Sequence, residues 1–239
     1  MTSTSPRYGK PNFEMLKTWI GRPPEEDGPF WALNLMKYRA VADYGDGRDT
    51  AISGRAADNA YAPLGPLAAV GAMVAFHGDV ARQGAGAPQW DRIGIVRYPT
   101  RAAFFAMQQR DDFKQQHVHK DAGMECTIVM SCLPDAGRPP IPTPAGTLVL
   151  RVGRVRERGD LPEVDGAVRV ATFDVEGVIV GDDRTWSRVA FDSAPTDEIA
   201  ESLLGAAGGI DEMFAMVLAR PGIDAIEESI RTAPENGTT

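Results

Sequence analysis

The sequence has few of the residues that build cross-links and metal centres, with 2 cysteines and 3 histidines among 239 residues. Cys126 and Cys132 fall in one predicted strand, where about six residues at ~3.3 Å each separate them by roughly 20 Å, too far for a disulfide. The histidines, cysteines and acidic residues also lack the spacing of a metal site. These features favour a cytoplasmic protein with no metal centre.

The sequence also lacks the marks of nucleic-acid and membrane proteins. Its formal net charge is −8 and its pI is near 5.0, and it has no run of Lys and Arg. We therefore expect no nucleic-acid partner. The longest apolar run, 67–76, is far short of the ~20 residues of a membrane span. Residues 1–10 contain no apolar core of a signal peptide, so we expect no membrane partner either.

The composition is that of a folded protein, with 43% hydrophobic and 24% charged residues. The length allows one large domain or two of ordinary size. The proline-rich segment 134–146 is typical of a linker. We therefore expect an N-terminal extension (1–29), a first domain (30–133), this linker, a second domain (147–231) and a disordered tail (232–239).

One stretch, 90–105, predicts a strand, a tight corner and a helix in succession. Its first part alternates β-branched and charged residues, as a strand does. Pro99 ends the strand because it lacks the N–H that a sheet ladder requires. Thr100 is a typical N-cap, and apolar residues at helical spacing follow it.

A weaker copy of this unit occurs at 186–197, where Trp, Arg, a β-branched residue and Pro-Thr recur in the same order. Segment 32–39 similarly resembles segment 149–156. The two echoes predict an internal duplication. The alternative is chance, because strands that end in Pro-Thr before a helix are common.

The hydrophobic pattern predicts four strands and two helical regions in each domain, although the second domain lacks the first crossover helix and instead has a helix after its last strand. In the first domain the strands are 30–39, 72–80, 90–98 and 124–133, and the helices are 54–70, broken near Pro63 and Pro66, and 100–122, broken near Asp111. In the second domain the strands are 147–156, 168–180, 186–191 and 213–220, and the helices are 196–204 and 223–231. Segment 161–166 is too short to supply the first crossover helix. A short helix capped by Asn12 precedes both domains. The order is β-α-β-β-α-β, the ferredoxin-like arrangement.

Three motifs carry a resemblance to a known family. They are Asn-Leu-Met-Lys at 34–37, Trp-Asp at 90–91 with Arg-Tyr-Pro-Thr-Arg-Ala-Ala-Phe at 97–104, and His-Lys-Asp-Ala-Gly-Met at 119–124. Residues 30–133 resemble the dimeric α+β barrel superfamily, in an uncharacterised branch of it. That branch usually has Ser at the position of Thr100 and Arg at the position of Lys120. The second half resembles the fold pattern only.

The resemblance implies an α+β fold in which two ferredoxin-like units face each other and close a barrel, with the helices outside. Two chains normally do this, whereas a tandem-duplicated chain would do it alone, as a pseudo-dimer with a degenerate second unit. The resemblance therefore implies either a monomer or a homodimer. Members of the superfamily include cofactor-independent monooxygenases, lactone isomerases, polyketide cyclases, aldoxime dehydratases and haem enzymes, so the fold leaves the chemistry open.

Strand alternation collects polar residues among apolar ones on one face of the first sheet, the composition of a small-molecule pocket. These residues are Asn34, Tyr38, His77, Tyr98, Thr127 and Ser131. We expect this face to line the barrel. His77 would transfer protons there, because imidazole titrates near neutrality. Asn34 and Tyr98 would donate hydrogen bonds to an oxyanion. The predicted substrate-binding residues are Tyr38, Met36, Trp90, Arg101, Thr127, Ser131 and Arg151.

Several of these residues have a structural alternative. The imidazole of His77 could instead bond to Asp79 or to a backbone carbonyl. Arg101, in the first turn of a helix, would pair with an acid such as Asp91 or reach an anionic ligand group. His117 and His119 point apart on a helix and are typical of a solvated face, with His119 the sole donor considered for haem. Arg151 lies in the second half, where we expect the wall of the site and not its chemistry.

Two hypotheses of different kinds follow, and a third is kept open. The first is a cofactor-independent enzyme of the cyclase, isomerase or monooxygenase type, acting on a small apolar or polyketide-like molecule. The second is a non-catalytic protein that binds such a molecule in the same pocket. The third is a haem-dependent dehydratase or oxidase.

Overall fold

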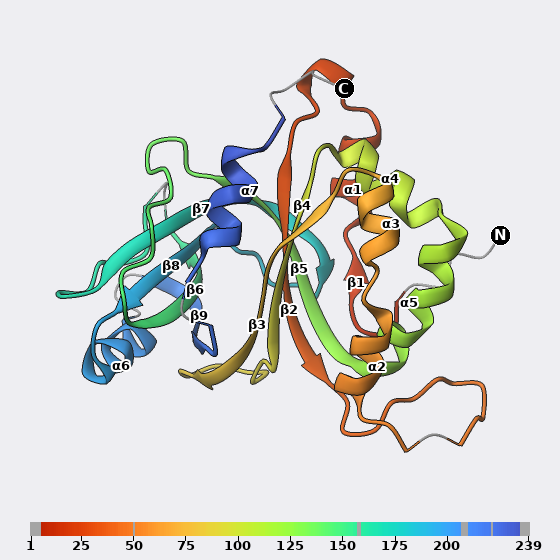
Figure 1. Cartoon of the computed structure of the whole chain (residues 1–239), viewed down its shortest axis with the longest axis horizontal. Coiled ribbons are helices and arrows are strands. Elements are labelled where there is room, and N and C mark those ends of the chain that lie inside the picture. Colours follow the sequence, from red (N-terminus) through yellow and green to blue (C-terminus); the bar gives the residue numbers. More distant parts are fainter. Residues whose placement is uncertain (1–5, 50, 157–158, 207–209, 221, 235–239) are drawn as a thin grey trace.

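The structure, a computed structural model, describes residues 6–49, 51–156, 159–206, 210–220 and 222–234. Its strands form one antiparallel sheet that closes into a barrel within the single chain (Figure 1). The barrel strands are β2 (Phe30–Tyr38), β3 (Met73–Gln83), β4 (Arg92–Tyr98), β5 (Met124–Pro134), β6 (Thr147–Val155), β7 (Val168–Gly181), β8 (Arg188–Ala194) and β9 (Ile210–Leu218). A short strand, β1 (Lys10–Pro11), pairs with the C-terminal end of β7.

The helices lie outside the barrel or at its end. They are α1 (Phe13–Ile20), α2 (Gly54–Tyr61), α3 (Leu64–Ala69), α4 (Arg101–Gln109), α5 (Asp111–Gly123), α6 (Asp197–Gly205) and α7 (Asp224–Arg231), with a 3₁₀ turn at Pro24–Glu26. None of the helices in the described part of the chain has the length and apolar character needed to cross a membrane. Most of the predicted disordered tail, 235–239, lies outside the described residues.

The helix starts follow from capping residues that the sequence displays. The side chain of Asn12 accepts a hydrogen bond from Met15 N, and that of Thr100 accepts one from Ala103 N. The predicted helix breaks near Pro63 and Asp111 are confirmed, since α2 and α3 separate at Ala62 and Pro63, and α4 and α5 separate at Arg110. The predicted break near Pro66 is wrong, because Pro66 lies in the first turn of α3, where no backbone N–H is needed. Within the described residues between β6 and β7 no helix forms, as expected for that proline- and glycine-interrupted segment.

The two halves of the barrel have the same strand order. The first half is ordered β5-β2-β4-β3 and the second β9-β6-β8-β7, so in each the fourth strand pairs with the first, the first with the third and the third with the second. Antiparallel pairing of β5 with β7 and of β3 with β9 joins the halves. Neither half therefore leaves a long free edge, which open sheets must protect from unwanted pairing.

Apolar side chains fill the interior of the barrel. Leu33, Ile95, Leu150, Val189 and Met216 are each at most 2% exposed and belong to one cluster drawn from all parts of the sheet. A small gap in this cluster, beside Leu33 and Ile95, has no room for a water molecule. The interior is therefore a packed core that leaves no room for a ligand beside Leu33 and Ile95.

The outer faces of the two halves are covered differently. On the first half, α1, α3, α4 and α5 lie over a second apolar cluster, whereas on the opposite side α6 packs directly on β6 and β9 (Figure 1). Phe30 and Tyr98 stack under the first set of helices with their ring centroids 5.3 Å apart. Space for a ligand therefore arises where the helices of the first half stand off the sheet.

The prediction that the polar face of the first sheet lines the barrel is wrong. Leu33 and Leu35 enter the interior, and Ala32 and Tyr98 lie under the helices. Alternation separates the two faces of a strand but does not say which one the barrel encloses, and the more uniformly apolar face is the one enclosed. We find the polar face outside.

The prediction that His77 points into the barrel is wrong for a second reason. The pairing of β3 with β4 shifts by one residue between Val74 and Phe76, so one strand carries an extra residue. Such a bulge reverses the alternation that follows it. Phe76 consequently enters the interior cluster, and His77 lies on the outer face, exposed to solvent.

Helix α7 ties the end of the chain to the barrel interior. Its Ile226 and the preceding Ile223 join the interior cluster. The indole Nε1 of Trp31 donates a hydrogen bond to Ser229 Oγ at 2.8 Å, and both residues are buried. This contact joins the start of β2 to the last helix.

Replacing Ser229 by Ala should lower the free energy of unfolding by about 1–3 kcal/mol, because the buried Trp31 N–H then has no acceptor. Urea denaturation measures the loss. The control is Ser202→Ala, which removes an exposed hydroxyl from α6 and should change stability by less than about 0.5 kcal/mol. Equal stability of the two variants would contradict the role given to the Trp31–Ser229 bond.

Candidate functional site

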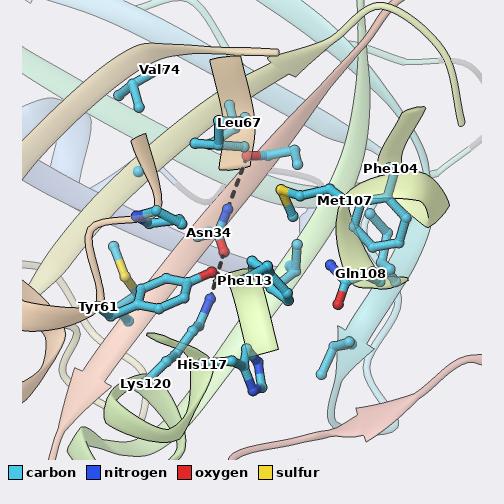
Figure 2. Close-up of a pocket in the computed structure, with 18 of the residues that line it drawn as sticks. Asn34, Tyr61, Leu67, Val74, Phe104, Met107, Gln108, Phe113, His117 and Lys120 are labelled. Carbon is cyan, nitrogen blue, oxygen red and sulfur yellow. Dashed lines mark hydrogen bonds between the residues drawn. The ribbon is translucent and has the colours of Figure 1, made fainter. Parts of the chain in front are cut away.

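A cavity of about 790 Å³ lies between the outer face of the first half and its helices. Its floor is formed mainly by β2, β3 and β4, with smaller contributions from β5 and the end of β7, and its roof by α1, α2, α3, α4 and α5 (Figure 2). Most of the lining is apolar. The labelled apolar residues of the lining are Leu67, Val74, Phe104, Met107 and Phe113, and the polar ones gather around Asn34, Tyr61, His117 and Lys120. An apolar cavity with a few convergent polar groups is the usual form of a small-molecule site.

Three residues in one cross-strand row form the floor of the cavity. Gly94 of β4 pairs with Asn34 of β2 on one side and with His77 of β3 on the other. Neighbouring strands are ~4.8 Å apart, so His77 and Asn34 stand roughly 10 Å apart. Gly94 has no side chain, and the Met36 methyl lies above it, since a Cβ there would come within 3.3 Å of that methyl. A ligand over Gly94 would have an imidazole at one end and an amide at the other.

Lys120 brings a cation into the same end of the cavity as Asn34. Its side chain is 8% exposed, and its Nζ donates to Asn34 Oδ1 at 3.3 Å (Figure 2). The ammonium lies over the rings of Tyr8 and Tyr61, at 5.5 and 5.3 Å from their centroids. Within the described residues no carboxylate is close enough to form an ion pair with it. Burial lowers the pKa of Lys120, because a low-dielectric surrounding disfavours the charged amine.

Asn34 is held in one orientation beneath this amine. Its Nδ2 donates to the carbonyl of Ala32 at 3.0 Å, so its Oδ1 faces Lys120. The amide thus fixes the position of the ammonium.

His117 forms the neighbouring part of the roof. Its Nε2 lies 2.7 Å from the Tyr8 hydroxyl, and the rings of Phe113 and Tyr61 have centroids 5.3 and 6.0 Å from its own. Burial, and secondarily the charge of Lys120, lowers the pKa of His117 to about 4. The imidazole is therefore neutral near pH 7, and the interpretation of its helix face as solvated is wrong.

An ion-pair network closes the wall beside α2. Asp58 accepts a hydrogen bond from the Tyr38 hydroxyl at 2.6 Å and lies 3.4 Å from Arg92. Arg92 also reaches Asp79 at 2.8 Å, and Arg55 reaches Asp79 at 2.6 Å. Burial, followed by the charge of Asp58, raises the pKa of the Tyr38 hydroxyl. Tyr38 therefore serves the wall and does not line the cavity.

His77 lies at the rim of the cavity. Among the described residues its imidazole has no hydrogen-bond partner, because the Asp79 carboxylate is taken by Arg55 and Arg92. Its backbone carbonyl accepts from Arg220 at 2.7 Å. Partial burial lowers the pKa of His77, so the imidazole is neutral near pH 7 and free to accept a proton.

The structure brings together four of the residues predicted from sequence, namely Asn34, Met36, His77 and Tyr98, all of which line the cavity. Tyr98 lies toward the apolar end, where its hydroxyl is 3.4 Å from Met107 Sδ. Burial raises the pKa of that hydroxyl, so it stays protonated.

The other predicted residues are engaged elsewhere. Trp90 packs inside the barrel, 5.5 Å from the ring of Phe214. The hydroxyl of Thr127 donates a hydrogen bond to Leu35 O at 2.7 Å, and that of Ser131 donates one to Glu176 at 2.8 Å. Arg151 forms an ion pair with Asp192 at 2.8 Å. Arg151 is fully buried in the second half.

Arg101 pairs with acids, although not with Asp91. Its guanidinium reaches Glu176 at 2.7 Å and the carbonyl of Gly28 at 2.9 Å. Asp91 instead bonds to Lys37 and to the backbone of β2. The partner Glu176 lies on β7 of the second half, so this buried pair holds the halves together.

Two residues of the site, His117 and Lys120, were not predicted from the sequence. Their spacing from Phe113 is i, i+4 and i+7, which places all three on one face of a helix. That pattern, with an aromatic residue marking the buried side, is the signal by which they could have been found.

No protein-family model and no curated protein matches the chain. Among solved structures, the chain is similar to RPA0582, a protein of unknown function from Rhodopseudomonas palustris, with 25% identity over 54% of this chain and 95% of that chain and a TM-score of 0.44. The methylated RPA0582 protein matches with 29% identity over 51% of this chain and 90% of that chain, also with a TM-score of 0.44. A mutant chlorite dismutase from Candidatus Nitrospira defluvii matches with 10% identity over 89% of this chain and 98% of that chain, with a TM-score of 0.45. TM-scores below 0.5 do not establish a shared fold or activity.

The lowered pKa of His117 makes stability depend on pH. Between its folded value of about 4 and its ordinary value of 6.5, the unfolded chain binds one more proton at this site. The contribution is therefore complete above about pH 6.5 and is lost as the pH falls toward 4, by at most about 1.4 kcal/mol per pH unit.

We expect His117→Gln, which keeps a polar group beside Tyr8 and does not titrate, to show a shallower loss of stability than the wild type over this range. Urea unfolding at several pH values measures both slopes. His119→Gln is the control, because His119 lies outside the cavity and bonds to Tyr44. Identical slopes for His117→Gln and the wild type would show that His117 is not buried as described.

Proposed function

We propose that the protein is a cofactor-independent enzyme that moves a proton on a small, largely apolar organic molecule, in the manner of an isomerase or cyclase. The observation that supports this most is the row of His77, Gly94 and Asn34 beneath an apolar cavity, with Lys120 beside Asn34. It combines a neutral base, a floor position without a side chain and a cation within the span of one small substrate.

In this proposal the carbonyl oxygen of the substrate lies near Lys120, and the carbon that loses the proton faces His77. The neutral imidazole accepts the proton, and the C–H electron pair passes into an enolate whose oxygen the ammonium stabilises. The proton then returns to another carbon, or the enolate attacks a second carbonyl of the same molecule. Asn34 positions Lys120, and Tyr98 contacts the apolar end of the substrate.

We also propose that the two halves arose by tandem duplication and that the chain works as a monomeric pseudo-dimer. Their shared strand order supports this, as do the closing pairs β5–β7 and β3–β9. The second half supplies structural charges, such as Glu176, and not the chemistry.

Haem, which some proteins of the resembled superfamily carry, finds no ligand in the histidines of α5. His119, the donor considered from the sequence, lies outside the cavity and bonds to Tyr44. A haem iron requires an imidazole nitrogen that points into open space. The Nε2 of His117 faces the Tyr8 hydroxyl at 2.7 Å, with three aromatic rings around the imidazole. Among the described residues no group of three or more His, Cys, Asp or Glu side chains is placed to hold a metal ion.

Deuterium exchange into 2-tetralone, a small apolar ketone with acidic C–H bonds, tests the proposed chemistry. In D₂O near pH 7 the wild type should exchange these protons faster than buffer, as followed by NMR. His77→Ala should reduce that acceleration on the order of a hundredfold, because the base is lost. His119→Ala is the matched control and should keep the wild-type rate. Binding of 2-tetralone without any exchange would favour the non-catalytic binding protein.

Filling the floor tests where the molecule lies. Gly94→Leu should weaken binding of 2-tetralone at least tenfold, because the new side chain would occupy the space between His77 and Asn34. Gly205→Leu, at an exposed position with nothing within 4 Å, is the control and should bind as the wild type does. Calorimetric titration measures both affinities, and unchanged binding by Gly94→Leu would place the ligand elsewhere.

A further inference from the structure

Among the charged side chains that line the cavity, the amine of Lys120 is the one that forms no ion pair within the described part of the chain. Lys120 is only 8% exposed. Burying a charged side chain is costly unless an opposite charge accompanies it. Three other buried cations have such partners, since Arg92 pairs with Asp58, Arg101 with Glu176 and Arg151 with Asp192. Arg97, which does not line the cavity, instead donates to the backbone carbonyls of Thr232 and Gly71. Lys120 has a neutral amide at 3.3 Å and two aromatic faces.

The acids nearest to this end of the cavity are already neutralised. Asp58 lines the cavity, but it is bonded to Tyr38 and paired with Arg92. Asp79 is shared by Arg92 and Arg55. The two carboxylates and two guanidiniums of this network balance, which leaves the charge of Lys120 in excess. This local excess stands out in a chain whose net charge is −8.

We propose that the cavity takes an apolar molecule bearing a carboxylate, and that this carboxylate forms an ion pair with Lys120. An ammonium has three N–H donors, and Asn34 accepts one of them. Figure 2 shows the amine rising from α5 toward Asn34, at the polar end of the cavity. Of the two remaining donors, one is available to a carboxylate oxygen and the other to the carbonyl oxygen of the proposed reaction.

The rest of the lining defines the body of the ligand. Leu67, Phe104 and Met107 form an apolar region beyond Asn34 (Figure 2). The volume of about 790 Å³ falls within the ~300–1,000 Å³ of pockets that hold small organic molecules. The ligand class is therefore an aryl or polycyclic monocarboxylate, with the acid at one end and an apolar body. This inference shares its cavity with the proposed function but does not require the proposed reaction to occur.

Calorimetric binding of a matched pair of probes tests the inference. The probes are 1-naphthylacetate and 2-(1-naphthyl)ethanol, which share the apolar body and differ in the carboxylate. The wild type should bind the acid at least tenfold more tightly than the alcohol, since only the acid supplies the missing charge. Lys120→Met should remove this preference while still binding the alcohol, and Lys120→Arg should keep part of it.

Lys114→Met is the matched control, because it removes the same charge from an exposed position of the same helix, 58% exposed. It should retain the full preference for the acid. Equal affinity of the wild type for the two probes would overturn the inference, and that comparison needs no variant to fold. A preference that survives in Lys120→Met would overturn it too. Binding of the acid through Lys120 without proton exchange on 2-tetralone would leave the inference standing and refute the proposed enzyme activity.

Discussion

The apolar filling of the barrel decides where this protein can hold a small molecule. Interior residues such as Leu33, Ile95 and Phe191 are almost fully buried, and they exclude both water and ligands from the centre. Polar residues of the strands must then lie on the outer face. On the first half the helices α1 to α5 stand off that face, whereas on the second half α6 packs directly on the sheet. The cavity and its asymmetry both follow from this packing.

The presence or absence of an acid partner distinguishes the structural buried cation Arg101 from the candidate functional one, Lys120. The buried pair of Arg101 and Glu176 joins the two halves, and its removal on one side would leave an uncompensated charge. Lys120 is buried to a similar degree, but its partners are an amide and two rings. A buried cation without an acid is retained at a cost in stability, and in a cavity that cost is offset when an anionic ligand binds. The neutral His117 and His77 add groups that can accept protons at pH 7.

Local structure could be predicted from the sequence, whereas the placement of the site could not. Capping by Asn12 and Thr100, and the helix break at Arg110, follow from residue chemistry within a few positions. The face of the sheet that the barrel encloses depends on contacts between distant strands. The bulge at Val74–Phe76 moved His77 to the other face, and no residue pattern announced it. The partner of Arg101 lies 75 positions away, beyond the reach of local reasoning.

The central claim is that the ligand lies outside the barrel, under the helices of the first half. A crystal structure of the protein with 1-naphthylacetate tests it most directly. The account predicts a carboxylate within hydrogen-bond distance of Lys120 Nζ and a naphthyl ring over Gly94. A ligand found inside the barrel beside Leu33 and Ile95, or against Arg151 in the second half, would contradict it.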